Sequence, residues 1–166
     1  AMGNMFAESG LNSRNLQNSY EKKLGYTDAS YTKAVDNGSY RNFAFDKAGY
    51  GLCQWTYSTR KAALLAFAKT FGDAEMQLKF FMKELREGYP AVLSVLKTST
   101  MVREASDEVL LKFERPADQS EAVRAKRAAY GQAYYNTLTG KETTMFTNSP
   151  LVSYTRISPN KTPNRN

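Results

Sequence analysis

The sequence contains no histidine among its 166 residues and only one cysteine, Cys53. The absence of histidine excludes Ser-His-Asp catalysis, Cys-His proteases and zinc sites built on imidazole. The single cysteine excludes an intrachain disulfide framework and fits synthesis in a reducing cytoplasm. Without histidine, Cys53 also lacks the base that usually activates a cysteine nucleophile. We therefore expect no metal and no cofactor, and few acids and bases other than carboxyl groups remain for catalysis.

Long apolar segments are also missing. The longest runs, such as residues 62–68, are much shorter than a bilayer span, and the N-terminus has no basic stretch followed by an apolar signal region. We expect no membrane span and synthesis in the cytoplasm without a signal peptide. The length and the 42% content of hydrophobic residues fit one compact domain, which we place at residues 1–140, followed by a tail at 141–166.

Acidic residues are outnumbered, with 16 Asp and Glu against 23 Lys and Arg, which gives a net charge of +7. Such a chain is attracted to polyanions, and charge alone does not separate acidic wall polymers from nucleic acids. A nucleic-acid face would fit the basic run near the C-terminal end, formed by Arg124, Lys126 and Arg127 with Tyr130. A basic run on a terminal helix is usually a solvated surface, so we expect no nucleic-acid partner.

Residues 3–12, GNMFAESGLN, have the pattern of a helix end. Met5 and Phe6 precede Glu8 on the last turn, and Gly10 provides the stop. Burial and the negative end of the helix dipole both disfavour a charged carboxyl group, so we expect the pKa of Glu8 to rise from about 4.3 toward roughly 6. Such a group can protonate a leaving oxygen near neutral pH, which makes Glu8 the candidate general acid.

A second motif, GYGLCQW, occupies residues 49–55. Gly49 and Gly51 are typical of a tight turn, and a turn without side chains also lets a sugar ring approach main-chain amides. The amide of Gln54 offers donors and acceptors that suit hydroxyl and N-acetyl groups, so we expect it to bind substrate. We expect Tyr50 and Tyr130 to be aromatic platforms for a sugar, and Trp55 to be a core residue whose indole N–H is bonded internally.

The pairing of this Glu-Ser helix end with GYGLCQW resembles the phage tail lysozyme family, the muramidase-type domains of phage tail tips and endolysins. The resemblance extends to about Leu138 through NLQN at 15–18, WT at 55–56, the stretch 76–85 and FERP at 113–116. It implies a lysozyme-like, mainly α (α+β) fold, in which a cleft separates a helical lobe from a small irregular or β lobe. It further implies a monomer, made in the bacterial cytoplasm, that cleaves β-1,4 glycan strands of cell-wall peptidoglycan, with Glu8 as the catalytic acid.

The secondary structure divides accordingly. Residues 12–47 predict the irregular lobe, with a turn at 36–39, a strand at 40–45, and at 31–35 either its partner strand or a short helix. Helical periodicity then predicts helices that begin at Ser58, after a cap at Asp73, at Pro90, near Val102 and near Ser120. The helix near Val102 ends before Pro116, and the helix near Ser120 ends at Gly140.

The site pattern also calls for a second carboxylate. We choose Asp46, because a short loop before the glycine turn can return it to face Glu8. The same lobe also offers Glu21, Asp28 and Asp36. Glu114, beside Arg115, is expected to pair structurally at a helix end. A separation of roughly 5 Å between the two carboxyl groups predicts retention, about 6.5 to 9.5 Å predicts inversion, and some lysozyme-like enzymes use one glutamate and a held water.

Three alternatives stay open. A basic, tyrosine-rich module can bind peptidoglycan without cutting it, and a cutting enzyme can be a glucosaminidase or a lytic transglycosylase instead of a muramidase.

Residues 149–160 resemble the lead-in to an amidase domain in modular clostridial wall hydrolases, and they equally fit a disordered C-terminus.

Overall fold

The computed structural model of the protein describes residues 1–140, which are mainly helical, as predicted. The elements, in chain order, are α1 (Met2–Ser9), α2 (Asn18–Leu24), α3 (Asp28–Asp36), α4 (Ser58–Phe67), α5 (Ala74–Gly88), α6 (Pro90–Thr98), α7 (Val102–Glu108), the π-helix η1 (Val109–Glu114) and α8 (Glu121–Thr139). Within this part of the chain the only β pairings are isolated bridges from Tyr50 to Leu16 and Trp55. The predicted tail at 141–166 and its amidase-like lead-in lie outside the described residues.

Local signals set four helix boundaries where the sequence predicted them, whereas α4 ends at Phe67, before the stop expected from Gly72. Gly10 ends α1 in the left-handed region, at φ 62°. The side chain of Asp73 caps α5 by accepting a 2.6 Å hydrogen bond from the backbone N–H of Met76. Pro90 is the first residue of α6, and the Ser120 side chain caps α8.

The lobe predicted as irregular or β contains two short helices, α2 and α3, and is otherwise irregular. Residues 31–35 lie inside α3, so the helix is the correct one of the two alternatives. The strand predicted at 40–45 is absent, because this segment satisfies its backbone groups through local turns. The Tyr40 N–H donates back to the Ala34 carbonyl, and the Phe45 N–H donates to the Asn42 carbonyl, both at 2.9 Å.

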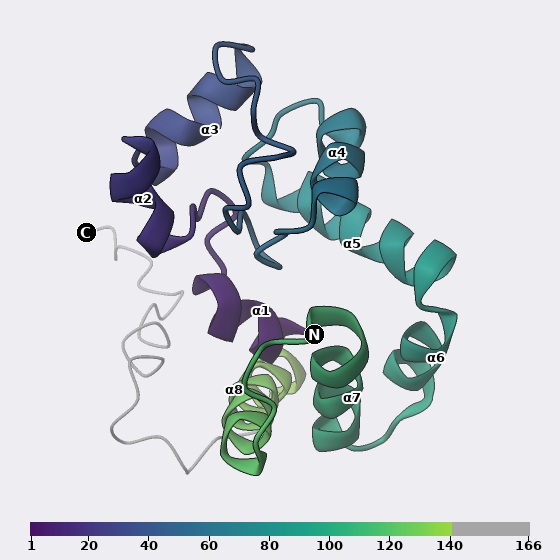
Figure 1. The fold of residues 1–166 in the computed structure, drawn as a ribbon. Helices are drawn as coiled ribbons and strands as arrows, with labels where there is room; N and C mark the ends of the chain where they lie inside the picture. The colour runs from purple at the N-terminus through teal and green to yellow at the C-terminus, as the bar shows by residue number, and fades with distance from the viewer. Residues whose placement is uncertain (141–166) are drawn as a thin grey trace, which may run out of the picture.

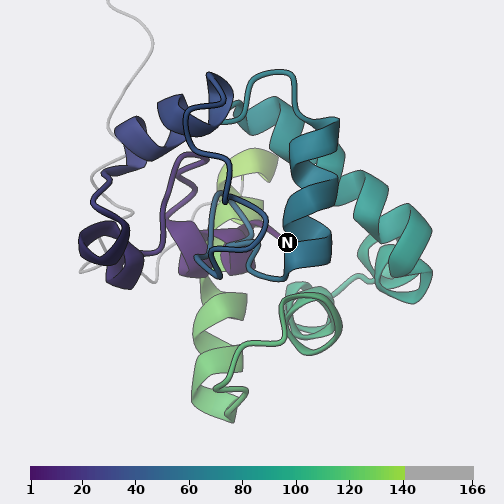
Figure 2. The same cartoon turned by 45° about the horizontal axis from the view of Figure 1, so that its top comes forward.

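Helix α1 lies at the centre of the molecule, between the group α2, α3 and α4 on one side and α7 and α8 on the other (Figure 1). The second view keeps α8 and α7 together at the side opposite α3 and α4 (Figure 2). Helix α1 packs directly on α8. A Cβ at Gly3 would lie 2.3 Å from the Arg127 carbonyl oxygen and 2.4 Å from the Gly131 nitrogen, so the two helices meet backbone to backbone.

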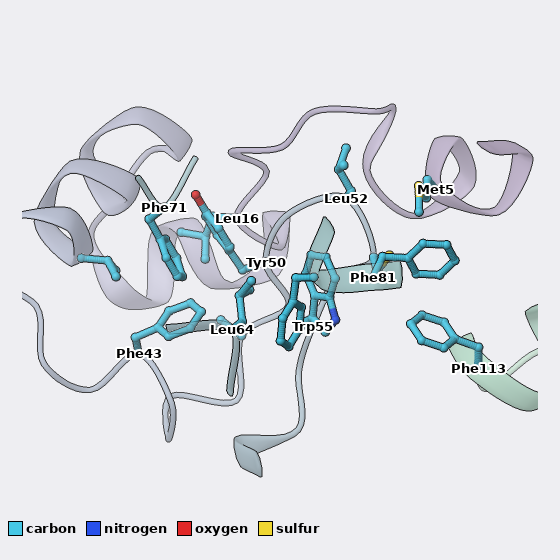
Figure 3. Close-up of a cluster of buried hydrophobic side chains, with 14 of the residues drawn as sticks. Met5, Leu16, Phe43, Tyr50, Leu52, Trp55, Leu64, Phe71, Phe81 and Phe113 are labelled. Carbon is cyan, nitrogen blue, oxygen red and sulfur yellow. The ribbon is translucent and has the colours of Figure 1, made fainter. Parts of the chain in front are cut away.

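One continuous core supports both predicted motifs (Figure 3). At one end, the Tyr50 ring stacks on Phe71 with centroids 4.7 Å apart. At the other, Phe81 meets Phe113 of η1 edge to face at 5.0 Å. The core therefore fixes the 49–55 turn relative to the end of η1. None of the helices in residues 1–140 has both the length and the apolar character needed to cross a membrane.

Candidate active site

The end of α1 is joined directly to the glycine turn. The Ser9 hydroxyl, one residue after Glu8, donates a 3.1 Å hydrogen bond to the Leu52 carbonyl. The turn itself is closed by reciprocal backbone hydrogen bonds between Tyr50 and Trp55, at 3.2 and 3.0 Å. Gly51 has φ 74°, and a Cβ there would lie 2.5 Å from Oε1 of Gln77, so glycine is required. The two sequence motifs thus form one structural unit.

A cavity of about 360 Å³ opens where this unit meets α4 and the end of η1. Its volume falls within the range of roughly 300–1,000 Å³ that is typical of ligand sites. The lining combines carboxyl, amide, hydroxyl, guanidinium and aromatic groups, from Glu8, Gln17, Cys53, Gln54, Thr56, Tyr57, Arg60, Glu114, Arg115 and Pro116. The structure therefore brings two carboxyl groups, those of Glu8 and Glu114, to one polar cavity.

Glu8 is held by a cation from the far end of the chain. Its side chain is 20% exposed, and its Oε1 accepts a 2.5 Å hydrogen bond from Nη2 of Arg127 on α8. Arg127 is buried, and its Nη1 has no partner among residues 1–140. The sequence pattern of Arg127, a run of basic residues, predicts only a solvated surface. The second arginine of that run, Arg124, pairs with Asp107, so neither arginine belongs to an open basic face.

Glu114 is the second carboxyl group of the cavity, whereas its sequence pattern predicts a structural ion pair at a helix end. It is the last residue of η1, and the next residue, Arg115, turns the chain away at φ 51°. Its Oε1 is enclosed by protein, and Glu114 makes neither a hydrogen bond nor an ion pair within residues 1–140, so the expected structural pairing is absent. Burial, together with the nearby charge of Glu8, raises the pKa of Glu114 to about 8.

One wall of the cavity is a rigid polar cluster. Arg60 donates two hydrogen bonds to Glu84, from Nε to Oε1 at 2.6 Å and from Nη2 to Oε2 at 2.8 Å. The Trp55 indole N–H donates to the same carboxylate at 2.8 Å, and Trp55 is fully buried, which confirms the predicted core role. The guanidinium of Arg60 also lies 4.4 Å from the ring centre of Phe113.

The structure does not bring Asp46 to Glu8. Asp46 is fully buried and does not line the cavity. It pairs with Lys61 and accepts hydrogen bonds from the hydroxyl groups of Tyr31, at 2.5 Å, and Tyr40, at 3.0 Å. The loop before the glycine turn thus directs this carboxylate into the core, where it compensates a buried lysine.

The three residues predicted to bind substrate lie in different surroundings. Gln54 lines the cavity, but its Nε2 donates inward, to Asn15 and to the Gly51 carbonyl. Tyr50 is fully buried, with its hydroxyl group 2.7 Å from that of Thr32, so it offers no platform to a ligand. Tyr130 lies outside the cavity lining, where it packs edge-on against Phe6 at 4.7 Å.

Tyr57 is the aromatic residue that sequence reasoning missed. It lines the cavity, and it is 69% exposed. Its only sequence signal was its position two residues after the glycine motif. Cys53 also reaches the lining, but burial raises the pKa of its thiol, which keeps it protonated. No group of three His, Cys, Asp or Glu side chains within residues 1–140 is placed to hold a metal ion.

Comparison with known proteins gives one result. No curated protein and no solved structure matches the chain. A family model described as phage tail lysozyme matches residues 1–138, a span that includes the whole cavity lining. The match agrees with a mainly α fold that places the Glu-Ser helix end beside the glycine turn. The chain therefore belongs to the phage tail lysozyme family, and it is a lysozyme-like hydrolase of peptidoglycan.

Proposed function

We propose that this protein is an N-acetylmuramidase that cleaves β-1,4 glycosidic bonds of peptidoglycan, with Glu8 as the general acid. One observation carries the proposal: Glu8 lies in a polar cavity beside the glycine turn to which its own helix is bonded. A glycosidase needs a carboxyl group in a cleft that admits a sugar chain, and this cavity supplies one.

The surroundings of Glu8 fit the chemistry of the reaction. Arg127 restricts the Glu8 side chain to one position, which orients its second oxygen for a leaving group. Glu8 then donates a proton to the glycosidic oxygen while positive charge develops at the departing sugar carbon. The exposed ring of Tyr57 provides an apolar face for a sugar ring at the cavity. The net charge of +7 favours approach to a wall that carries acidic polymers.

The test is digestion of purified peptidoglycan by the wild-type protein, Glu8→Gln and, as a matched control, Glu75→Gln. Glu75 is an exposed residue of α5 outside the cavity lining. Gln at position 8 can still accept the hydrogen bond from Arg127, so the variant is expected to fold. We expect it to lose turnover, whereas Glu75→Gln keeps the wild-type rate.

Mass spectrometry of the products identifies the bond. A new reducing end on N-acetylmuramic acid supports the proposal, whereas one on N-acetylglucosamine or a 1,6-anhydro product contradicts the muramidase assignment. Retention of turnover in Glu8→Gln contradicts the role of Glu8. Binding of wild-type protein to insoluble peptidoglycan without release of reducing sugar would instead indicate a non-catalytic wall-binding module.

A further inference from the structure

Both arginines whose charge acts on Glu114 are already bound to other carboxyl groups. The charged or titratable groups that face Glu114 come from α1, the glycine turn, α4, α5 and α8, and they are the amino group of Ala1 and the side chains of Glu8, Cys53, Arg60, Glu84 and Arg127. The two arginines are already engaged, Arg60 by Glu84 and Arg127 by Glu8. Neither arginine is therefore paired with Glu114.

The enclosed oxygen of Glu114 agrees with the absence of an ion-pair partner. An ionised carboxylate in such a position would need hydrogen-bond donors, and Oε1 receives none within residues 1–140. A neutral carboxylic acid costs far less there, because only its charged form requires strong compensation. The high pKa of Glu114, caused first by burial and then by the charge of Glu8, points the same way.

We propose that Glu8 and Glu114 share one proton, which rests on Glu114 in the empty cavity and reaches the glycosidic oxygen by way of Glu8. This inference rests on the proposed function, because it supplies the proton that an arginine-bound Glu8 needs. Glu114 acts through Glu8 and is therefore a positioning residue in the reaction.

The proton balance closes over one turnover. Glu114 releases its proton to water in the cavity as Glu8 takes a proton from that water, so one O–H bond breaks on Glu114 and one forms on Glu8. Glu8 then gives this proton to the leaving oxygen. The water molecule that attacks the sugar carbon releases one proton, which returns to the pair. The charge of Arg127 acts on Glu114 and lowers its pKa, so it favours the charged form of Glu114 during this step. Like charges that face each other in one site favour such sharing.

The first test measures titration directly and needs no substrate. Side-chain carboxyl groups are followed by ¹³C NMR on glutamate-labelled protein between pH 3 and 10, in the wild type, Glu8→Gln, Glu114→Gln and Glu75→Gln. We expect one carboxyl group with a midpoint near pH 8 in the wild type and in Glu75→Gln, and none in Glu114→Gln. Removal of the Glu8 charge should lower that midpoint by about one pH unit or more. Absence of a glutamate that titrates above pH 6, or an unchanged midpoint in Glu8→Gln, overturns the proposal.

The second test compares pH–rate profiles on purified peptidoglycan. We expect Glu114→Gln to turn over about tenfold or more slowly than the wild type at pH 7, with an unchanged KM. Its rate should recover in acid, where Glu8 takes its proton from solvent. A profile identical to that of the wild type, or a loss that is equal at every pH, overturns proton sharing. If the wild-type protein releases no sugar at any pH, the proposed function fails, and the NMR titration still decides whether the pair holds a common proton.

Discussion

Arg127 on α8 and Glu8 on α1 lie 119 residues apart in sequence, and they are joined by a 2.5 Å hydrogen bond between Nη2 and Oε1. The pair connects the candidate catalytic carboxyl group to the helix on which α1 packs backbone to backbone. The position of Glu8 in the cavity therefore depends on α8 as much as on its own helix.

The first prediction concerns this pair. Arg127→Gln should slow peptidoglycan turnover by about tenfold or more, and it should lower the free energy of unfolding by about 1.5–3 kcal/mol, because a charge-assisted hydrogen bond is lost. Arg124→Gln is the matched control, since it removes an arginine of the same helix that pairs with Asp107 away from the cavity. Urea denaturation and initial rates give both quantities. Equal losses of turnover in the two variants would show that the Glu8 contact has no special role.

Sequence reasoning succeeded where the decisive signal is local. Gly10 and Asp73 mark helix ends through conformations and hydrogen bonds within a few residues, and Glu8 lies in the cavity because it precedes such an end. Arg127 was missed as a partner because helical periodicity does not reveal which remote helix it meets. Glu114 was missed because it ends a π-helix, whose turns shift side chains away from the positions that α-helical spacing predicts.

Buried polar networks set the second limit on what the sequence predicts. Asp46 and Tyr50 both carry groups suited to a sugar site, and both instead satisfy partners inside the core. Nothing in the sequence around Asp46 shows that Lys61, 15 residues away, is buried and needs a counter-charge. Residue type and motif spacing therefore identified segments that line the cavity, but they did not show which polar groups face inward.

The second prediction separates a structural role of Asp46 from a catalytic one. Asp46→Asn should destabilise the protein by about 3–5 kcal/mol, because it leaves the Lys61 ammonium buried without its counter-charge. Burial already lowers the pKa of Lys61, so the unpaired lysine is expected to lose its proton. At a temperature where the variant remains folded, its turnover should match the wild-type rate. Thermal unfolding combined with rates on folded protein measures this, and loss of turnover at full stability would restore Asp46 as a catalytic candidate.

The third prediction follows from the pKa of Glu114, which folding raises from 4.5 to about 8. Below pH 4.5 the folded and unfolded chains both hold the proton. Between pH 4.5 and 8 the unfolded chain releases it while the folded chain keeps it, so this group makes stability fall as pH rises. At pH 8, Glu114→Gln should therefore have a higher free energy of unfolding than the wild type, by a few kcal/mol at about 1.4 kcal/mol per pKa unit. Urea denaturation measures this difference, which should vanish near pH 4. A pH-independent difference would contradict a buried, protonated Glu114.

The fourth prediction tests the contact between α1 and α8 with three glycines. Gly3→Ala places a methyl group 2.3 Å from a backbone oxygen of α8, so it should cost about 3 kcal/mol and slow turnover by displacing Glu8 from Arg127. Gly131→Ala meets a Val102 methyl at 3.2 Å and the Gly3 backbone only at 4.0 Å, and Gly88→Ala has no neighbour within 4 Å, so both should stay within about 1 kcal/mol of the wild type. Chemical denaturation ranks the three variants. A mild effect at Gly3 would indicate that the helices do not pack this closely.

The last prediction concerns Tyr57, the exposed ring of the cavity lining. If this ring stacks on a sugar, Tyr57→Ala should raise the KM for soluble glycan fragments about tenfold, which corresponds to about 1.4 kcal/mol, with little change in kcat. Tyr57→Phe keeps the ring and should preserve the wild-type KM. Phe45→Ala is the control, because Phe45 is equally exposed, at 71%, but does not line the cavity. The rise in KM should therefore depend on where the lost ring lies. A rise in KM that appears equally in Phe45→Ala would assign it to general surface adhesion, and an unchanged KM in Tyr57→Ala would place the glycan elsewhere along the cavity.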